Sequence, residues 1–297
     1  MKKVLITGAN GFVGHYVAQQ LLQKSYKVVA TGKGNCRLPF RSKNFLYETL
    51  DFTNEEAVSR VFKKHQPDIV IHSGAISKPD ECELDKEKAF LINVTGTKYL
   101  LKHSEIFKSF FIFLSSDFIF SGEEEGMYAE EDAAAPVNYY GHTKLLAEEE
   151  VKQYVYDWSI VRTVLVYGPT LSGRHNILTF VAEGLKKERP LQIFNDQIRT
   201  PTYVEDLAEG IVRLVENHKT GIYHISGEEV LTPYDMAIAV AEYLRLNTAL
   251  IKPATAATFD QPARRPLKTG FNIAKAKKEL DYACTPFKEG LAKTFTK

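Results

Sequence analysis

A glycine-rich turn that follows a short apolar run is the feature that most constrains the fold of this chain. Val4-Leu5-Ile6 leads into Gly8, Gly11 and Gly14, which follow a GxxGxxG spacing. Glycine allows a tight turn and a close approach of the backbone to a ligand, and the helix that follows points unsatisfied N–H groups at an anion. We therefore expect a strand, a turn and a helix that bind the pyrophosphate of a dinucleotide; the plain alternative is a glycine-rich turn without a ligand.

Apolar strands alternate with helices through the first half of the chain. The sequence predicts strands at 4–7, 27–31, 69–72, 110–115 and 159–163, and helices at 12–24, 55–65, 82–103 and 138–154. Such alternation is typical of a parallel sheet covered on both faces, which binds ligands at the carboxyl ends of its strands. The predicted fold class is α/β, a Rossmann-type doubly wound parallel sheet with a small C-terminal substrate lobe.

The pattern changes after Tyr167-Gly168-Pro169. A polar loop is followed by a helix to about residue 188, a strand at 191–194, a helix at 203–217 and a strand at 221–226, and the last predicted helices are 233–246 and 273–280. We expect residues 1–167, joined by about 203–226, to form the dinucleotide-binding domain. Residues 168–202 and 227–297 are expected to form the substrate lobe.

Composition limits the partners and the compartment. The 297 residues are 44% hydrophobic and 25% charged with a net charge of +1, so no overall field attracts nucleic acid or an anionic membrane. Cys36, Cys82 and Cys284 are far apart and lack metal-ligand spacing. The N-terminus lacks a signal-peptide pattern, and the longest apolar stretch, 110–114, is too short to span a bilayer. We expect a reduced, cytoplasmic protein with no nucleic-acid or membrane partner and no bound metal.

A second motif, Tyr140-Gly-His-Thr-Lys144, places a phenol and an ammonium four residues apart. On a helix this spacing brings the two side chains to one face. Such a pair alone is more often a surface feature than a site. Combined with a dinucleotide cradle, it indicates hydride transfer to or from a carbonyl. Tyr139 lacks the four-residue spacing to the lysine.

The end of the second predicted strand bears on the choice of cofactor. An acid there would bind the ribose 2′-OH of NAD, whereas a base accommodates the 2′-phosphate of NADP. The chain has Lys33 in this turn, Arg37 nearby and no acid in the turn. This favours NADP(H), with NAD(H) possible, because both cations are nearly as well explained as solvated loop charges. Asp51 and Phe52 are candidates to hold the adenine.

These motifs, with others in the same order, resemble the extended short-chain dehydrogenase/reductases, and among them the dTDP-4-dehydrorhamnose reductase group. The matching stretches run nearly from end to end: Val4–Gly14, His72–Ile76, Asn93–Thr97, Ser115–Phe120, Pro136–Lys144, Val161–Thr163, Tyr167-Gly168, Pro201–Asp206 and Arg265-Pro266.

The resemblance implies roles for five residues. Tyr140 would be the general acid that protonates the carbonyl oxygen, and Lys144 would lower the phenol pKa and bind the nicotinamide ribose. Ser116 would hydrogen-bond the substrate oxygen. Asn93 would support a proton relay behind the lysine, and Thr163 would lie near the nicotinamide.

The complete set of candidate ligand-binding residues is larger. The candidates for the cofactor are Gly8, Asn10, Gly11, Phe12, Val13, Gly14, Lys33, Arg37, Asp51, Phe52, Ser73, Gly74, Ala75, Tyr140, Lys144 and Thr163. The candidates for the substrate are Ser116, Asp117, Phe118, Tyr140, Arg174, Arg199 and Arg264. The arginines are included because a planar guanidinium pairs with a diphosphate through two hydrogen bonds. Each is equally well explained as a surface arginine.

Three departures affect the sugar site that the resemblance implies. Leu165 stands where the group usually has Trp, Arg199 replaces a Gly before Pro-Thr, and Phe118 replaces a Tyr. We expect an NADP(H)-dependent reductase of a 4-keto nucleotide sugar, as a possible homodimer. The alternatives are a nucleotide-sugar epimerase or dehydratase, and a non-catalytic NADP-binding regulatory subunit like that of methionine adenosyltransferase.

Overall fold

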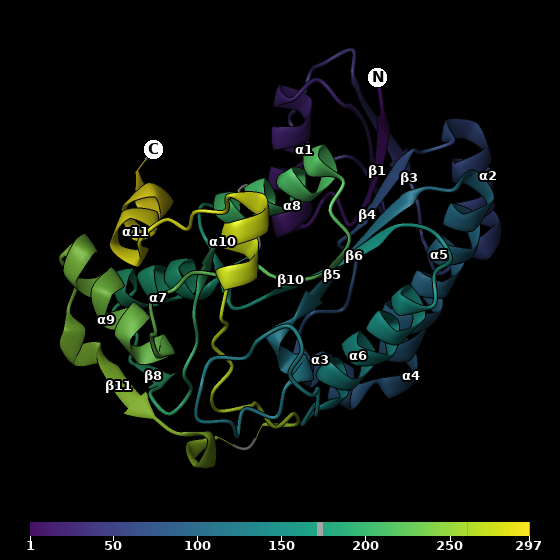
Figure 1. Ribbon diagram of the computed structural model, residues 1–297. Coiled ribbons are helices and arrows are strands. Elements are labelled where there is room, and N and C mark those ends of the chain that lie inside the picture. The colour runs from purple at the N-terminus through teal and green to yellow at the C-terminus, as the bar shows by residue number, and fades with distance from the viewer. Residues whose placement is uncertain (171–174, 260, 297) are drawn as a thin grey trace.

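A seven-stranded sheet forms the centre of the computed structural model, which describes residues 1–170, 175–259 and 261–296 (Figure 1). Every neighbouring pair of strands in this sheet is parallel. The strand order is β10-β6-β5-β4-β1-β2-β3, so the direction of winding reverses between β1 and β4. The strands are β1 (Lys3–Thr7), β2 (Lys27–Gly32), β3 (Phe45–Thr49), β4 (Ile69–His72), β5 (Phe110–Ser116), β6 (Trp158–Thr163) and β10 (Gly221–His224). The predicted α/β fold class is confirmed.

Helices cover both faces of this sheet (Figure 1). One face packs against α1 (Phe12–Gln23), α8 (Val204–Asn217) and α10 (Ala274–Leu280), and the other against α2 (Glu55–His65), α5 (Gly96–Phe107) and α6 (Tyr139–Lys152). Successive side chains of a strand point to opposite faces. Val4 and Ile6 accordingly join the first core, and Leu5 joins the second. This alternation explains why the strands are apolar at nearly every position.

A smaller group of elements lies beside the carboxyl edge of the sheet (Figure 1). It contains α7 (Ile177–Lys186), α9 (Pro233–Leu244) and α11 (Phe287–Phe295), with a parallel pair formed by β8 (Leu191–Phe194) and β11 (Ile251–Ala254). Leu178, Val240 and Leu291 belong to its separate apolar core. A second short parallel pair, β7 (Val166–Tyr167) with β9 (Thr202–Tyr203), follows β6. Short 3-10 turns are η2 (Asp117–Ile119), η3 (Thr248–Leu250) and η4 (Ala256–Thr258).

The predicted helix 82–103 is wrong as a single element. It consists of α3 (Pro79–Leu84), α4 (Lys86–Phe90), the π-helical turn η1 (Leu91–Thr95) and α5. Asp85 ends α3 and its side chain caps α4 by accepting a hydrogen bond from the Lys88 backbone N–H. Four strands and one helix lie outside those predicted from the sequence: β3, β7, β9, β11 and α11.

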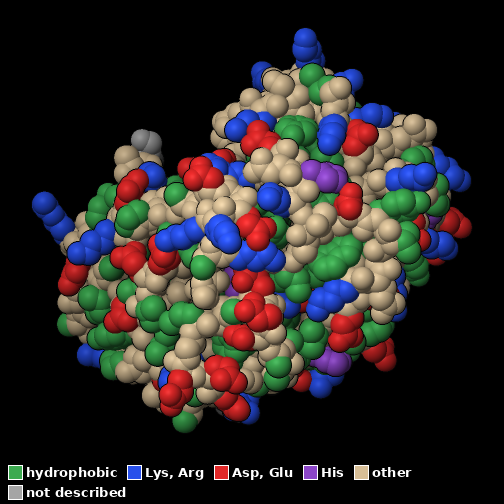
Figure 2. Space-filling model, viewed as in Figure 1, with side chains coloured by type: hydrophobic (Ala, Val, Ile, Leu, Met, Phe, Trp, Pro, Cys, Tyr) green, Lys and Arg blue, Asp and Glu red, His purple; other side chains and the backbone are tan. Residues whose placement is uncertain are grey.

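The surface carries mixed charge. Figure 2 shows acidic and basic side chains interspersed over the visible face, in keeping with the net charge of +1. Among the described residues, no helix has the length and apolar character needed to cross a membrane.

Candidate functional site

The glycine-rich turn connects β1 to α1 through close backbone contacts. Gly8 has a φ of +69°, and a Cβ there would lie 2.7 Å from the backbone N of Gly74. A Cβ on Gly14 would lie 2.6 Å from the Gly8 carbonyl oxygen. Larger residues at these two positions would push α1 and the chain after β4 away from the turn.

The first turn of α1 is arranged to bind an anion. Its N-cap is Gly11, which provides no side-chain hydrogen bond, so the first N–H groups of the helix have no side-chain cap. Gly11, Phe12, Val13 and Gly14 line a cleft of about 440 Å³. Unsatisfied N–H groups and the positive end of a helix dipole favour phosphate. The residues present therefore fit the pyrophosphate of a dinucleotide.

The same cleft collects residues from the carboxyl ends of β5 and β6 and from α6. Ser116, Tyr140, Lys144 and Thr163 all line it. Ser116 and Thr163 are register partners on neighbouring strands. The structure thus brings together four residues that the sequence analysis selected from three separate segments.

Helix α6 holds Tyr140 and Lys144 in fixed positions. Asn138 caps the helix by accepting a hydrogen bond from the Gly141 N–H. A Cβ on Gly141 would lie 2.0 Å from the Phe118 carbonyl oxygen, so this helix packs directly on the turn after β5. The Tyr140 and Phe118 rings meet edge to face, with centroids 5.7 Å apart. The Lys144 Nζ lies 3.9 Å from the centroid of the Phe113 ring.

Burial changes the proton affinity of both groups. It raises the pKa of Tyr140 well above its ordinary value, against a smaller lowering by a hydrogen bond with Ser116. Burial also lowers the pKa of Lys144 to about 7, opposed by the negative charge of Glu148. A phenol with a raised pKa stays protonated at neutral pH and can donate a proton, as a general acid must.

Asn93 lies in the π-helical turn η1, and its side-chain amide is fully engaged. Nδ2 donates to the Ile76 carbonyl oxygen at 3.1 Å and to Thr143 Oγ1 at 2.9 Å, and Oδ1 accepts from the Ile76 N–H at 2.9 Å. Thr143 directly precedes Lys144. π-Helical turns are frequent at functional sites, and this one ties the chain after β4 to α6. A role of Asn93 in a proton relay stays a prediction.

The expected cofactor-selecting loop is held by Asn10. The Asn10 Nδ2 donates to Tyr47 Oη at 2.7 Å and to the Asn35 carbonyl oxygen at 3.0 Å, and Oδ1 accepts from the Arg37 N–H at 2.9 Å. Lys33 Nζ pairs with Asp51 Oδ2 at 2.8 Å. The buried Asn10 thus shapes the loop that carries both cations. Phe52 is 8% exposed, and its ring packs edge to face on His72 with centroids 5.1 Å apart.

The three candidate arginines lie in different surroundings. Arg174 lies outside the described residues. The Arg264 side chain is 68% exposed and pairs with Glu123 at 3.5 Å. Arg199 is 3% exposed, and its guanidinium donates to the carbonyl oxygens of Ile198, Pro266 and Leu267. With these donors engaged in the interior, Arg199 is not placed to bind a diphosphate, which corrects the sequence expectation.

Several residues of the cleft were missed. Ser77, Ser115 and residues 175–177 also line it. Ser115 Oγ is buried without a hydrogen-bond partner among the residues described. Leu165, at the position expected for Trp, lines the cleft with a φ of +35°. The polar loop after Gly168 was the one signal for residues 175–177.

The parallel sheet, the glycine turn at the N-terminus of α1 and the buried Tyr140–Lys144 pair define a Rossmann-like α/β protein with a cleft bordered by these three features. The family model described as the RmlD substrate binding domain matches residues 1–297, so the chain belongs to this family. The resemblance to the dTDP-4-dehydrorhamnose reductase group is thereby confirmed. Related structures include dTDP-4-dehydrorhamnose reductases from Clostridium acetobutylicum (TM-score 0.86, 28% identity, 98% of each chain) and, in complex with NADP, Bacillus anthracis (TM-score 0.84, 27% identity, 99% of each chain).

Two relatives with similar sequences have names that refer to different functions. The spore coat polysaccharide biosynthesis protein SpsK of Bacillus subtilis is 33% identical, over 86% of this chain and 84% of that protein. Methionine adenosyltransferase 2 subunit beta of Mus musculus is 29% identical, over 98% of this chain and 86% of that protein. Family membership therefore relates the chain to NAD(P)-dependent reductases and also to a subunit of a different enzyme.

Proposed function

We propose that this protein is an NADP(H)-dependent reductase of a keto group on a nucleotide-linked sugar. The observation that carries the proposal is the convergence of Tyr140, Lys144 and Ser116 on one cleft with the N-terminus of α1. These groups come from β5, α6 and the turn after β1, and all are needed to hold a dinucleotide beside a carbonyl. The complex of the Bacillus anthracis reductase with NADP supports the choice of cofactor.

The residues have complementary tasks in the proposed reaction. When bound, the nicotinamide supplies a hydride to the carbonyl carbon. Tyr140 donates its phenolic proton to the carbonyl oxygen, and its raised pKa keeps that proton in place beforehand. Lys144 in its ammonium form binds ribose hydroxyls and stabilises the phenolate that remains. Ser116 orients the oxygen that receives the proton.

The substrate class rests on the relatives and on the shape of the cleft. Proteins named as dTDP-4-dehydrorhamnose reductase match nearly the whole chain. Leu165 is smaller than the Trp expected at its position, which favours a sugar of another shape or looser selection. Calorimetry with a panel of nucleoside diphosphates, with NADP present, tests this class. We expect at least one nucleoside diphosphate of the panel to bind with measurable heat. Binding of unphosphorylated sugars alone would contradict a nucleotide-linked substrate.

A pair of adjacent tyrosines allows a matched test of catalysis. Tyr140→Phe removes the acid and keeps the ring, so NADPH oxidation in the presence of a keto-sugar nucleotide should fall about a hundredfold or more. The dissociation constant for NADPH should be little changed. Tyr139→Phe makes the same chemical change on the neighbouring residue and should keep parental turnover. Equal rates for Tyr140→Phe and the parent would remove Tyr140 from the mechanism.

A second candidate function follows from the likeness to methionine adenosyltransferase 2 subunit beta, which covers 98% of the chain. In that case the cleft would bind NADP without turnover, and the protein would assemble with a methionine adenosyltransferase. Size-exclusion chromatography of this protein mixed with a methionine adenosyltransferase and NADP distinguishes the two candidate functions. A stable complex without keto-sugar reduction would favour the subunit. An epimerase would be recognised by tightly retained NAD in the purified protein.

A further inference from the structure

The carboxylate of Asp117 joins the proposed catalytic serine to two segments of the chain that lie far away in sequence. Asp117 directly follows Ser116 at the end of β5 and begins the η2 turn. Ser116 Oγ donates to Asp117 Oδ1 at 3.0 Å, and the Phe118 N–H donates to Ser116 Oγ at 3.3 Å. The serine hydroxyl is therefore held by one acceptor and one donor of its own turn.

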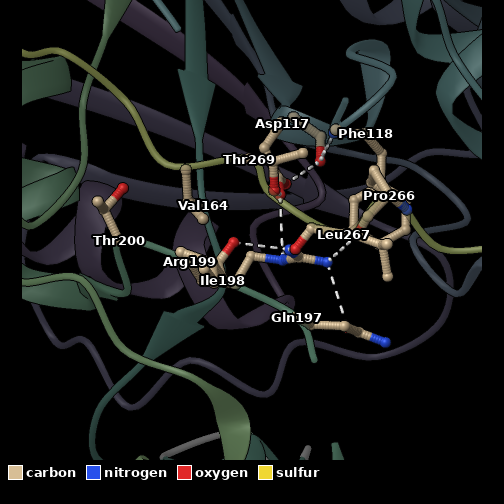
Figure 3. A network of polar contacts seen from close by, with 12 residues as sticks. Asp117, Phe118, Val164, Gln197, Ile198, Arg199, Thr200, Pro266, Leu267 and Thr269 are labelled. Atoms are coloured by element: carbon tan, nitrogen blue, oxygen red, sulfur yellow. Dashed lines mark hydrogen bonds and ion pairs between the residues drawn. The ribbon is translucent and has the colours of Figure 1, made fainter. Parts of the chain in front are cut away.

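The other carboxylate oxygen of Asp117 has its partners in the two distant segments. Thr269 Oγ1 donates to Oδ2, and Arg199 Nε lies 3.6 Å from the same oxygen (Figure 3). The exposed fractions are 2% for Asp117, 3% for Arg199 and 0% for Thr269. A buried carboxylate is costly unless it is paired and hydrogen-bonded. Here both oxygens are satisfied, so Asp117 is fixed although it borders the cleft.

Arg199 joins the two distant segments to each other. Its guanidinium donates to the carbonyl oxygens of Pro266 at 2.7 Å and Leu267 at 2.9 Å (Figure 3). The backbones of Ile198 and Leu267 are also hydrogen-bonded directly, at 2.6 Å. Segments 197–199 and 266–269 therefore behave as one unit where they meet the end of β5.

We propose that Asp117 is a positioning residue: Thr269 and Arg199 hold its carboxylate, and the carboxylate holds the Ser116 side chain at the cleft. The hydroxyl has one proton, so that proton turns from Asp117 to the carbonyl oxygen when a substrate binds. This gives the segments 197–199 and 266–269 a role in the reaction although they supply no group to the reacting atoms. The expectation that Asp117 contacts substrate stays a prediction, since Asp117 lines the cleft. The kinetic part of this inference rests on the proposed reductase function.

The chain offers matched variants to test it. Thr269→Val removes the hydroxyl that donates to Asp117 and keeps the shape, whereas Thr269→Ser keeps the donor. Thr200→Val makes the same change on a buried threonine that bonds Ser226 and the Phe271 N–H instead. We expect Thr269→Val to lower kcat for keto-sugar reduction by roughly tenfold with the NADPH dissociation constant unchanged. Thr269→Ser should restore the rate, and Thr200→Val should leave it near parental.

A double-mutant cycle separates positioning from general damage. In a Ser116→Ala background, Thr269→Val should change kcat by less than about twofold, because the group through which it acts is gone. An equal loss in both backgrounds, or no loss in the parent, would overturn the proposal.

A second cycle does not depend on turnover. Ser116→Ala and Thr269→Val should shift the urea midpoint by less together than the sum of their separate shifts, whereas Ser116→Ala and Thr200→Val should add. Should the parent reduce no keto-sugar nucleotide, the proposed function fails by itself and this cycle decides the inference. Additive shifts for Ser116 and Thr269 would then overturn it.

Discussion

The ion pair between Lys33, just after β2, and Asp51, just after β3, leads to a quantitative prediction about cofactor choice. Lys33 and Asp51 side chains are 58% and 43% exposed and meet at 2.8 Å. An exposed pair of this kind stabilises by at most about 1 kcal/mol. A hydrogen bond to a charged group contributes about 1.5–3 kcal/mol. If Lys33 leaves Asp51 to bind the 2′-phosphate of NADPH, the net gain is about 0.5–2 kcal/mol, or roughly 2-fold to 30-fold in the dissociation constant.

Two substitutions should move this preference in opposite directions. Lys33→Ala removes the cation and should reduce the ratio of the NADH to the NADPH dissociation constant by that roughly 2-fold to 30-fold factor. Asp51→Asn frees Lys33 and removes a negative charge, so NADPH should bind tighter by up to about 5-fold, the equivalent of the lost 1 kcal/mol. Both constants can be measured by the change in reduced-nicotinamide fluorescence on binding.

A control at a distant pair checks for an unspecific effect of charge. Lys24 pairs with Glu216 at 3.3 Å and is similarly exposed, so Lys24→Ala should leave both dissociation constants unchanged. The reasoning is refuted if the parent binds NADPH and NADH equally. It is also refuted if Asp51→Asn weakens NADPH binding, since Asp51 would then hold the cofactor itself.

Two further predictions concern pH and stability. The ammonium form of Lys144 predominates below its pKa of about 7. We therefore expect kcat/KM for reduction to be level below that pH and to fall about tenfold per pH unit above it. A value of kcat/KM that rises with pH would contradict the role assigned to Lys144. Arg162→Met should lower the free energy of unfolding in urea by about 3–5 kcal/mol, because it strands the fully buried Glu148 carboxylate, whereas Lys187→Met in an exposed pair should cost less than about 1 kcal/mol.

The strands and the Tyr140–Lys144 pair could be predicted because their signals are local. The apolar runs of β1, β4 and β5 are bounded by turn residues, and the Tyr140–Lys144 spacing is a property of one helix. β3 (Phe45–Thr49) escaped because it lies at the sheet edge, where its side chains are half-buried or exposed and the apolar pattern is weak. β11 contains Pro253, which argues against a strand in a sequence reading.

Other features depend on contacts that spacing does not contain. The π-helical turn at Leu91–Thr95 has no glycine or proline to mark it, yet it sets the direction in which Asn93 faces Ile76 and Thr143. Arg199 was predicted to bind a diphosphate from its charge alone. Its partners are carbonyl oxygens of residues about 70 positions away, so only the folded chain reveals that it is buried.

The raised pKa of Tyr140 sets the protonation state from which the proposed reaction begins. Burial raises the pKa of Tyr140 and lowers the pKa of Lys144 to about 7. A protonated phenol can donate its proton to the oxygen of a ketone, as reduction requires. Because a catalyst lowers the barrier in both directions, the same pair would also serve alcohol oxidation once the phenol is deprotonated. The cofactor retained in the purified protein and the products of turnover therefore separate a reductase from an epimerase, whereas the pKa of Tyr140 does not.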